Sequence, residues 1–525
     1  MTGKIKYPIG IQDFSEIINK GSIYIDKTKH INLLLNDGKY FFLSRPRRFG
    51  KSLFLSTLQA FFEGRKELFK GLDIDSDEVD WTPRPVIKLS LNTIDPRSEY
   101  SLTNYLGSIF REYENIYNIP DNDDEISRRF EVIINTAFKQ TGRKVAILID
   151  EYDAPLLNTL ENDTLNNSYR NTLRSVFSVL KNADACIEFA FITGVSRFSH
   201  TSLFSGANNL KDISLENKYA AICGITEEEL KTNLMPGIHD FAESIGVSDE
   251  EMFTMLKDHY DGYHFCKKSP DIYNPFSLMN SLQSQELNNY WFQSGTPSYL
   301  ISALKRDDFF LPNLDCLETI EGDLSAGESY IQNPVALLYE TGYVTIRKYD
   351  EEIESYILAL PNKEVATSFS RALLPIYSGL DSSACRESFN MIRKAALKGE
   401  ADNFMRHLQT FLQGNPYALT ELDKRERYFQ NNIFLIFRAL GFRPRVEEQT
   451  CNSRMDMMLR TRRYIYIFEL KTDGSTDKAM RQIDEKGYAL PYLDEGLPII
   501  KIAANYSTSA NNIDSWEIEK NNSIE

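Results

Sequence analysis

The stretch Tyr40-Phe-Phe-Leu-Ser-Arg-Pro-Arg-Arg-Phe-Gly-Lys-Ser52 gives the strongest indication of fold in this sequence. Its first part, Tyr40–Ser44, is a short apolar run that ends in a basic turn, as expected of a buried strand. The next part, Ser52–Glu63, carries leucine and phenylalanine at helical spacing. We therefore expect a strand, a short loop and a helix in direct succession.

Residues 45–52 are similar to a phosphate-binding loop (P-loop). Such a loop presents the backbone N–H groups of a helix start to phosphate, while a lysine reaches the β- and γ-phosphates and a hydroxyl binds Mg²⁺. Gly50, Lys51 and Ser52 occupy the Gly-Lys-Ser/Thr positions. Arg45 replaces the first glycine of the motif, so three arginines crowd the loop, where they could add charge to the phosphate site or bind something else. The alternative interpretation is an ordinary helix start.

A second motif lies about 100 residues further along the chain. Val145–Tyr152 is a continuous apolar run that ends in acids, which suits a buried parallel strand. In a nucleotide site Asp150 would hold Mg²⁺ through water, and Glu151 would polarise the attacking water. Thr193 ends the next strand and could sense the γ-phosphate, and Arg197 is an arginine-finger candidate. The alternative for all four is a structural role, such as a strand end meeting water.

Strands and helices alternate through residues 1–220, which predicts a parallel α/β sheet. Further strands are expected at Pro85–Leu91 and 187–193, and helices at 98–117, 125–140 and 168–182. Residues 221–330 look mostly helical. Residues 331–420 differ, because a helix, a hairpin and a second helix succeed one another there: Val335–Thr341, Tyr343–Tyr349 with Ile353–Leu360, and a helix from near Glu364. This order is compatible with a winged-helix-like connector.

Residues 421–510 form the last predicted domain, in which the order helix, three strands, helix, strand (αβββαβ) is expected. Alternation along a strand places Glu469 and Lys471 on the same face of the sheet. Asp456, on or beside the preceding strand, can reach that face. The polar tail Asn511–Glu525 is expected to be loose.

The carboxylates and the lysine of this segment suit the hydrolysis of phosphodiesters. Asp456 and Glu469 offer oxygen ligands to Mg²⁺, and Lys471 can orient or activate a metal-bound water and offset phosphate charge. Gln482 could position the lysine or the substrate, and Glu426 is a candidate further acid. The alternative interpretation is a surface Glu–Lys pair, against which the apolar character of the strand argues.

Composition sets the outer limits of these interpretations. A chain of 525 residues with 42% hydrophobic residues suggests about three or four folded domains. No apolar run is long enough to cross a bilayer, and six scattered cysteines without a CxxC pair suggest a reducing, cytoplasmic setting. The net charge of −16 argues against a basic whole-molecule grip on nucleic acid, but residues 421–471 carry eleven Lys/Arg against seven Asp/Glu.

Taken together, these motifs resemble bacterial AAA-ATPase-like proteins, common in Bacteroidetes, that are fused to a PD-(D/E)XK nuclease-superfamily domain. The resemblance rests on Tyr24-Ile-Asp-Lys-Thr28, Ser44-Arg-Pro-Arg-Arg-Phe-Gly-Lys-Ser52, Ile149-Asp-Glu-Tyr-Asp153, Ile192-Thr-Gly-Val-Ser-Arg197, Phe204-Ser-Gly206, Tyr290-Trp-Phe-Gln-Ser-Gly-Thr-Pro297, and the set Asp456, Glu469 and Lys471. It covers nearly the whole chain and implies that Arg45 is the family's own form of the loop.

The resemblance implies a P-loop AAA-ATPase-like domain at 1–220, a helical lid or extension at 221–330, the winged-helix-like connector at 331–420 and a nuclease-like, restriction-endonuclease-like domain at 421–510. Expected cofactors are ATP, bound by Arg48, Phe49, Gly50, Lys51, Ser52, Asp150 and Thr193, and Mg²⁺, held by Ser52 and Asp150 and by Asp456 and Glu469. Expected catalytic residues are Glu151, Asp456, Glu469 and Lys471.

Two functions remain open at this level. The first is an ATPase coupled to a Mg²⁺-dependent nuclease, acting on nucleic acid with DNA favoured, in defence or in the control of mobile elements by analogy. The second is a nucleotide-binding switch without turnover, whose C-terminal domain recognises nucleic acid or a partner protein. No membrane partner is expected. AAA-like ATPases often form homo-oligomeric rings, although the sequence shows no clear trans-acting finger.

Overall fold

The computed structural model describes residues 5–92, 94–120, 125–197, 203, 209–294, 298–306, 309–325, 334–378, 380, 382–413, 422–441, 443–444, 456–461, 463–510 and 512–521. The chain forms two compact units. The first comprises residues 1–293, 297–307 and 318–362, and the second comprises 294–296, 308–317 and 363–525. The four-part division expected from the sequence is finer than this and stays a prediction.

A five-stranded parallel sheet organises the first unit, as predicted. Its strands are β1 (Tyr40–Ser44), β2 (Val86–Ser90), β3 (Val145–Asp150), β4 (Ile187–Gly194) and β5 (Lys211–Asp212), in the spatial order β2-β3-β4-β1-β5. The side chains of β1 and β3 are buried throughout, because helices cover both faces of the sheet. The apolar runs in the sequence are therefore explained by burial on two sides.

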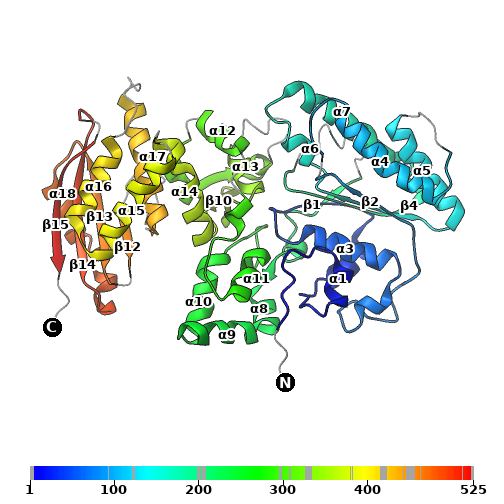
Figure 1. The fold of residues 1–525 in the computed structure, drawn as a ribbon, viewed down its shortest axis with the longest axis horizontal. Coiled ribbons are helices and arrows are strands. Elements are labelled where there is room, and N and C mark those ends of the chain that lie inside the picture. The colour runs from blue at the N-terminus through cyan, green and yellow to red at the C-terminus, as the bar shows by residue number, and fades with distance from the viewer. Residues whose placement is uncertain are drawn as a thin grey trace. The chain divides into compact units, whose positions relative to one another are not determined.

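Helices on the two faces come from different parts of the first unit. They are α1 (Phe14–Asn19), α2 (Lys29–Asp37), α3 (Lys51–Phe62), α4 (Ser101–Ile116), α5 (Ile126–Thr141), α6 (Ala154–Leu157) and α7 (Asp163–Asn182). Figure 1 shows α4, α5 and α7 along one face, and α1 and α3 along the other. The helices expected at 98–117, 125–140 and 168–182 are thus present with small shifts at their ends.

The middle of the chain is mostly helical, as expected. Its elements are β6 (Ile225–Thr226), α8 (Glu227–Asn233), α9 (Met235–Ile245), α10 (Asp249–Tyr260), β7 (Ile272–Tyr273), α11 (Pro275–Ser284) and α12 (Ser298–Arg306). Two capping boxes start α8 and α10, in which Thr226 and Ser248 each exchange hydrogen bonds with a glutamate three residues on. The buried faces of these helices form one apolar cluster that includes Leu230, Phe241 and Leu256.

The predicted helix and hairpin are both present. They are α13 (Pro334–Glu340) and the antiparallel pair β9 (Thr345–Asp350) and β10 (Ser355–Ala359), which β8 (Leu317–Ile320) extends to a three-stranded sheet. The second predicted helix, α14 (Lys363–Ser378), begins where the second compact unit resumes. The order of a winged-helix-like module is therefore confirmed, while the unit boundary falls between the hairpin and its second helix.

The second unit is built on a mixed five-stranded sheet in the order β11-β12-β13-β14-β15. Its elements after α14 are α15 (Ser382–Lys398), α16 (Ala401–Gln413), α17 (Leu422–Leu440), β11 (Arg443–Pro444), β12 (Asp456–Arg460), β13 (Ile465–Thr472), α18 (Thr476–Glu485), β14 (Ile499–Ser507) and β15 (Asn512–Asn521). The run from α17 to β14 is the predicted αβββαβ order, and Figure 1 shows its helices beside the sheet.

The expectation of a loose tail is wrong over most of its length. Residues Asn512–Asn521 form β15, which pairs antiparallel with β14 along nine residue pairs. Ile513 is fully buried, and the indole N–H of Trp516 donates to Asp402 of α16 at 3.1 Å. The tail is rich in polar residues because one face of an edge strand meets water. These outward residues obscure the alternation of apolar and polar positions from which a strand would be predicted.

No helix in the described ranges is long and apolar enough to span a membrane.

Candidate functional sites

The loop between β1 and α3 has the backbone of an anion-binding turn. Arg48 and Gly50 adopt positive φ angles of 69° and 96°, and Gly50 is the N-cap of α3. No side chain in the described part of the chain caps the first turn of α3. The N–H groups at this helix start, together with the helix dipole, therefore favour a bound anion.

Lys51 lies inside this loop and is only 5% exposed. Its ammonium donates to the backbone carbonyls of Arg45 at 2.8 Å and Pro46 at 3.0 Å. Burial lowers the pKa of Lys51, and the nearby carboxylates of Asp150 and Glu151 act in the opposite direction. Within the described residues no carboxylate contacts this ammonium, so a phosphate at the loop would provide its counter-charge.

Arg45 stands at the position of the missing glycine and does not extend into the loop. Its guanidinium, on a residue 2% exposed, donates to the carbonyls of Ser44, Ser214 and Tyr219 at 2.8, 2.8 and 3.1 Å. It also lies 4.3 Å from the ring centre of Phe265. Arg45 thereby clamps the base of the loop to the segment that follows β5, a structural role that the sequence did not predict.

Arg48 and Phe49, two further predicted loop residues, pack their side chains against aromatic rings. The guanidinium of Arg48 lies 3.8 Å from the ring centre of Phe276. Phe49 packs its ring edge-on against Tyr263 and Phe265, and its carbonyl accepts the N–H of Gly224 at 3.0 Å. The backbone N–H groups of both residues remain candidates for contacts with a phosphate.

The back of the loop is held by residues far away in sequence. The indole of Trp291 donates to the carbonyl of Arg47 at 3.2 Å. A Cβ atom placed on Gly342, whose φ is +85°, would lie 2.7 Å from Pro46, so this approach requires glycine. The sequence did not indicate these contacts, because no local pattern around Trp291 or Gly342 points to a partner so far away in the chain.

Asp150 and Thr193 meet at the ends of neighbouring strands. The Thr193 hydroxyl donates to Asp150 Oδ1 at 2.6 Å, and both side chains are buried, at 0% and 4% exposure. Glu151 follows with a positive φ of 50°, an unusual conformation for a non-glycine residue. Burial raises the pKa of Glu151, which suits a general base.

Sheet topology explains why these groups converge. β4 lies between β1 and β3, with Leu43 in register with Thr193 and Ile149 with Ile192. In a parallel sheet the carboxyl ends of all strands lie on one edge, where ligands of such sheets bind. The loop after β1, Asp150 at the end of β3 and Thr193 in β4 therefore share that edge.

Asp153 is a site residue that sequence reasoning quoted without giving it a role. Its Oδ2 accepts from the N–H groups of Val195 and Ser196 at 3.0 and 2.6 Å, and from the Ser196 hydroxyl at 2.5 Å. It thereby ties the segment after β3 to the segment after β4. A third acid in the motif, three residues after Asp150, was the available signal.

Arg197 is engaged elsewhere in its own unit. Its guanidinium forms an ion pair with Asp212 at 2.9 Å, and its N–H donates to Glu340 at 2.8 Å. An arginine finger must reach a nucleotide phosphate. This arrangement does not support the arginine-finger prediction. Phe204-Ser-Gly206 and the end of the Tyr290–Pro297 motif lie outside the described residues.

In the second unit, Glu469 and Lys471 lie on one face of β13, as predicted. The Lys471 ammonium donates to Glu469 Oε1 at 2.7 Å and to Gln482 Oε1 of α18 at 2.5 Å. Glu469 is 2% exposed, so the interpretation as an exposed surface pair is wrong. Alternate residues Tyr466 and Phe468 contact aromatic rings of α16 and α17 on the opposite face.

Asp456 is the backbone partner of Glu469 across the antiparallel pair β12–β13. Its side chain lies outside the described part of the structure, as does that of Glu426 in α17. The structure therefore supports Asp456 by strand register and leaves Glu426 a prediction. Gln482, for which the sequence offered two roles, is placed against the lysine.

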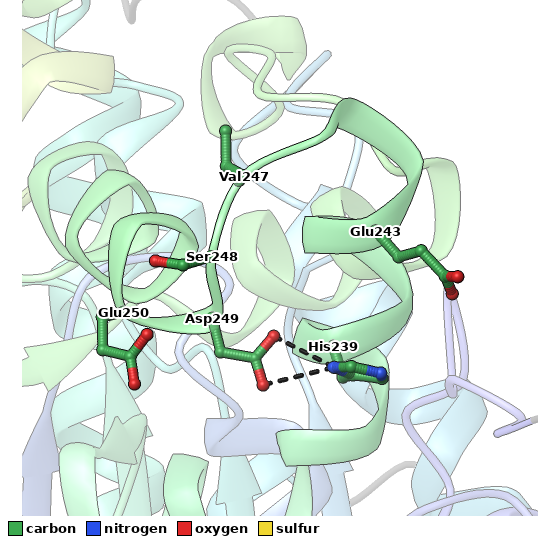
Figure 2. Close-up of a pocket in the computed structure, with 6 residues that line it drawn as sticks. All are labelled: His239, Glu243, Val247, Ser248, Asp249 and Glu250. Carbon is green, nitrogen blue, oxygen red and sulfur yellow. Dashed lines mark hydrogen bonds and ion pairs between the residues drawn. The ribbon is translucent and has the colours of Figure 1, made fainter.

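A separate hollow of about 450 Å³ lies between α9 and α10 and includes none of the predicted residues. Figure 2 shows His239 facing Asp249, with Nδ1 at 3.1 and 3.2 Å from the two carboxylate oxygens, while the carboxylate of Glu243 points away. The hollow is shallow and solvent-facing, unlike the buried groups at the sheet edges. We place the chemistry at the sheet edges.

Comparisons with known proteins agree with this division. Residues 8–204 match a family model described as predicted AAA-ATPase, and residues 424–516 match the PD-(D/E)XK nuclease superfamily. A protein of Azotobacter chroococcum mcd 1, described as "Uncharacterized protein in vnfD 5'region", is 34% identical over 523 residues, covering 98% of this chain and 99% of the relative.

Proposed function

Because the chain belongs to the family of AAA-ATPase-like proteins with a C-terminal PD-(D/E)XK nuclease-superfamily domain, we propose that it hydrolyses ATP and cuts nucleic acid. One observation carries the proposal. The loop before α3, which encloses Lys51, lies at one edge of the parallel sheet, and the hydrogen-bonded pair of Asp150 and Thr193 lies at the same edge.

In the first unit, the amides at the start of α3 and the ammonium of Lys51 would bind the β- and γ-phosphates. Ser52 and Asp150 would hold Mg²⁺, which neutralises phosphate charge when bound. Thr193 keeps one oxygen of Asp150 occupied at 2.6 Å and so orients the carboxylate. Glu151, with its raised pKa, would take the proton of the attacking water.

In the second unit, Asp456 and Glu469 would hold a divalent cation, which acts as a Lewis acid on the phosphodiester when bound. Two carboxylates in register on neighbouring strands fit the oxygen ligands that Mg²⁺ prefers. Lys471 would orient the attacking water and stabilise charge on the phosphate, and Gln482 would keep its ammonium on the active face.

The wider assignments are also proposals. Residues 221–330 would act as a lid on the ATPase domain 1–220, and 331–420 as a connector to the nuclease domain 421–510. We favour DNA as the substrate, a role in defence or mobile-element control, a homo-oligomeric assembly and a cytoplasmic location. The location is supported by free thiols at Cys186, Cys223, Cys266, Cys316 and Cys385.

A paired assay tests this function. Purified full-length protein, Lys51→Ala and Glu469→Ala would be measured for phosphate release from ATP and for cleavage of DNA and RNA with Mg²⁺ or Mn²⁺. We expect Lys51→Ala to lose turnover and Glu469→Ala to lose cleavage. Equal turnover by wild type and Lys51→Ala would overturn the ATPase assignment, and cutting that persists in Glu469→Ala would show a contaminant.

A nucleotide-binding switch without turnover is the second candidate. The net charge of −16 favours it, since a nuclease that grips nucleic acid broadly is usually basic. Its C-terminal domain would recognise nucleic acid or a partner protein without cutting. Nucleotide binding in a calorimetric titration, with neither turnover nor cleavage in the paired assay, would select this candidate.

A further inference from the structure

Lys471 has a long side chain, yet its ammonium is held at one place. The residue is 26% exposed at the side chain, and four methylenes would let its ammonium swing into solvent. Contacts with Glu469 and Gln482 hold its tip, but in the proposed function Glu469 turns to the cation once one is bound, which leaves Gln482 alone at the ammonium. Something else has to restrain the stem of this lysine.

The turn after β13 supplies that restraint. A Cβ atom placed on Gly474 would lie 2.9 Å from Cβ of Lys471 and 3.4 Å from its Cγ. The chain therefore folds back directly over the first carbons of the lysine. Asp473, just before, takes a positive φ of 46°, which makes this tight reversal.

Asn505 of β14 fixes the turn from the side of the sheet. It is the register partner of Lys471 across the parallel pair β13–β14 and is 6% exposed. Its Oδ1 accepts the N–H of Gly474 at 2.8 Å, and its Nδ2 donates to Asp514 Oδ1 at 3.0 Å. Both ends of this buried amide are thus used, which orients it in one way only.

We infer that Asn505 is a positioning residue for Lys471, acting through Gly474. By holding the Gly474 amide, it keeps the turn closed over the lysine stem and so directs the ammonium towards Glu469. The inference rests on the proposed nuclease function and deepens it, because it assigns a residue that does not touch substrate or metal. If the turn at Gly474 opens, the rate of cleavage should fall while substrate binding changes little.

The same turn has a second attachment, which provides a matched control. Thr508 donates its N–H and its hydroxyl to the two carboxylate oxygens of Asp473 at 2.9 and 2.5 Å. This contact is exposed and involves neither the N–H of Gly474 nor Asn505. Thr508→Ala should therefore loosen the turn without releasing the lysine stem.

The test begins with cleavage by the full chain. Asn505→Ala should lower kcat for DNA cleavage roughly tenfold to a hundredfold with little change in KM, since misplacement of a catalytic group acts on the rate. Thr508→Ala should stay within about twofold of wild type, as expected of an exposed contact. Cleavage by Asn505→Asp should also be slow, because the new carboxylate would face that of Asp514.

Adding Asp514→Asn to Asn505→Asp should restore the rate. The exchanged pair can again accept the Gly474 N–H and form the amide–carboxylate hydrogen bond with the donor on the other strand. A general loss of folding would not be repaired by this exchange. Failure of the double variant to recover, with unchanged thermal unfolding, would contradict the inference.

A second readout does not depend on catalysis. The folded protein would be acetylated with an N-hydroxysuccinimide ester and then digested. Mass spectrometry of the peptides reports how readily each lysine reacts in the folded state. Asn505→Ala should raise the labelling of Lys471 several-fold relative to Lys478, and the double exchange should reverse it. Unchanged labelling would overturn the inference even if wild type cuts DNA, whereas absence of cutting alone would overturn only the proposed function.

Discussion

The two sites use a lysine in opposite ways. Lys51 is buried among backbone carbonyls of its own loop, and no carboxylate contacts its ammonium within the described residues. Lys471 is partly exposed and contacts a carboxylate and an amide side chain directly. Under the proposed function, the first arrangement would receive an anion, and the second would balance charge until the carboxylates bind a cation.

The two sites also differ in how they are built. The proposed nucleotide site combines backbone N–H groups at the start of α3 with the side chains of Lys51 and Asp150, while Arg48 and Phe49 pack against aromatic rings. The nuclease site depends on side chains that alternate along β13. Substitutions in the first unit should therefore act through loop shape as well as through single functional groups, and those in the second unit mainly through single functional groups.

The largest expected effect is at Lys51. Lys51→Ala should reduce ATP turnover by at least about a hundredfold, because it removes the buried cation opposite the transferring phosphate. Phosphate release at saturating ATP would measure it. Lys70→Ala, which changes an exposed lysine of the same unit, is the control and should turn over normally. Comparable ATP turnover by Lys51→Ala and Lys70→Ala would show that Lys51 has no special role in turnover.

Glu469→Gln should have a similar effect on the other site. It keeps the size of a buried side chain but removes the charge that a divalent cation needs. Cleavage should fall roughly a hundredfold or more, while ATP turnover is retained. Gel assays of DNA cleavage across a Mg²⁺ titration would check this, and full activity at high Mg²⁺ would speak against metal binding by Glu469.

Arg45→Lys tests the loop clamp. Lysine cannot reach three carbonyls at once, so the unfolding free energy of the first unit should drop by about 3 kcal/mol. Urea denaturation would measure the loss, and nucleotide affinity should weaken with it. Arg47→Lys, at an exposed position of the same loop, should change stability by less than about 0.5 kcal/mol. Equal effects would show that Arg45 is no clamp.

The pH dependence of turnover tests Glu151. Its pKa is raised by burial, so it stays protonated to a higher pH than an exposed glutamate, whose pKa is about 4.3. A base works only when deprotonated, and turnover should therefore rise as pH increases through this raised pKa. Glu151→Gln should bind nucleotide yet lose this limb of the profile. Turnover that does not rise with pH above the range where an exposed glutamate titrates, at unchanged binding, would exclude Glu151 as the base.

The smallest expected effect is at Trp291. Trp291→Phe keeps an aromatic ring beside Tyr343 but removes the hydrogen bond to the Arg47 carbonyl. Nucleotide affinity should weaken about fivefold, equivalent to about 1 kcal/mol. Fluorescence titration with a labelled ATP analogue would detect this. Tighter binding in the variant would mean that the contact holds the loop in an unfavourable shape.

Much of this arrangement was predictable from local pattern. Apolar runs marked β1 and β3, and the residues at their ends had to meet once the strands were parallel neighbours of β4. Glu469 and Lys471 followed from period-two alternation alone. These inferences needed only properties that neighbouring residues share.

What escaped prediction depends on distant partners or on weak pattern. The sequence left the role of Arg45 open because two of its acceptors, the carbonyls of Ser214 and Tyr219, lie far along the chain. Asn505 has no local feature that links it to Gly474. The strand β15 was missed since its outward residues are polar, and only pairing with β14 defines it.

Calorimetric titration of the full chain with Mg²⁺ and a non-hydrolysable ATP analogue tests the central claim most directly. Binding with one site per chain by wild type, and none by Lys51→Ala at the same concentrations, is the predicted result. No binding by folded wild-type protein would contradict both the ATPase and the switch, because each requires polyphosphate at the loop before α3.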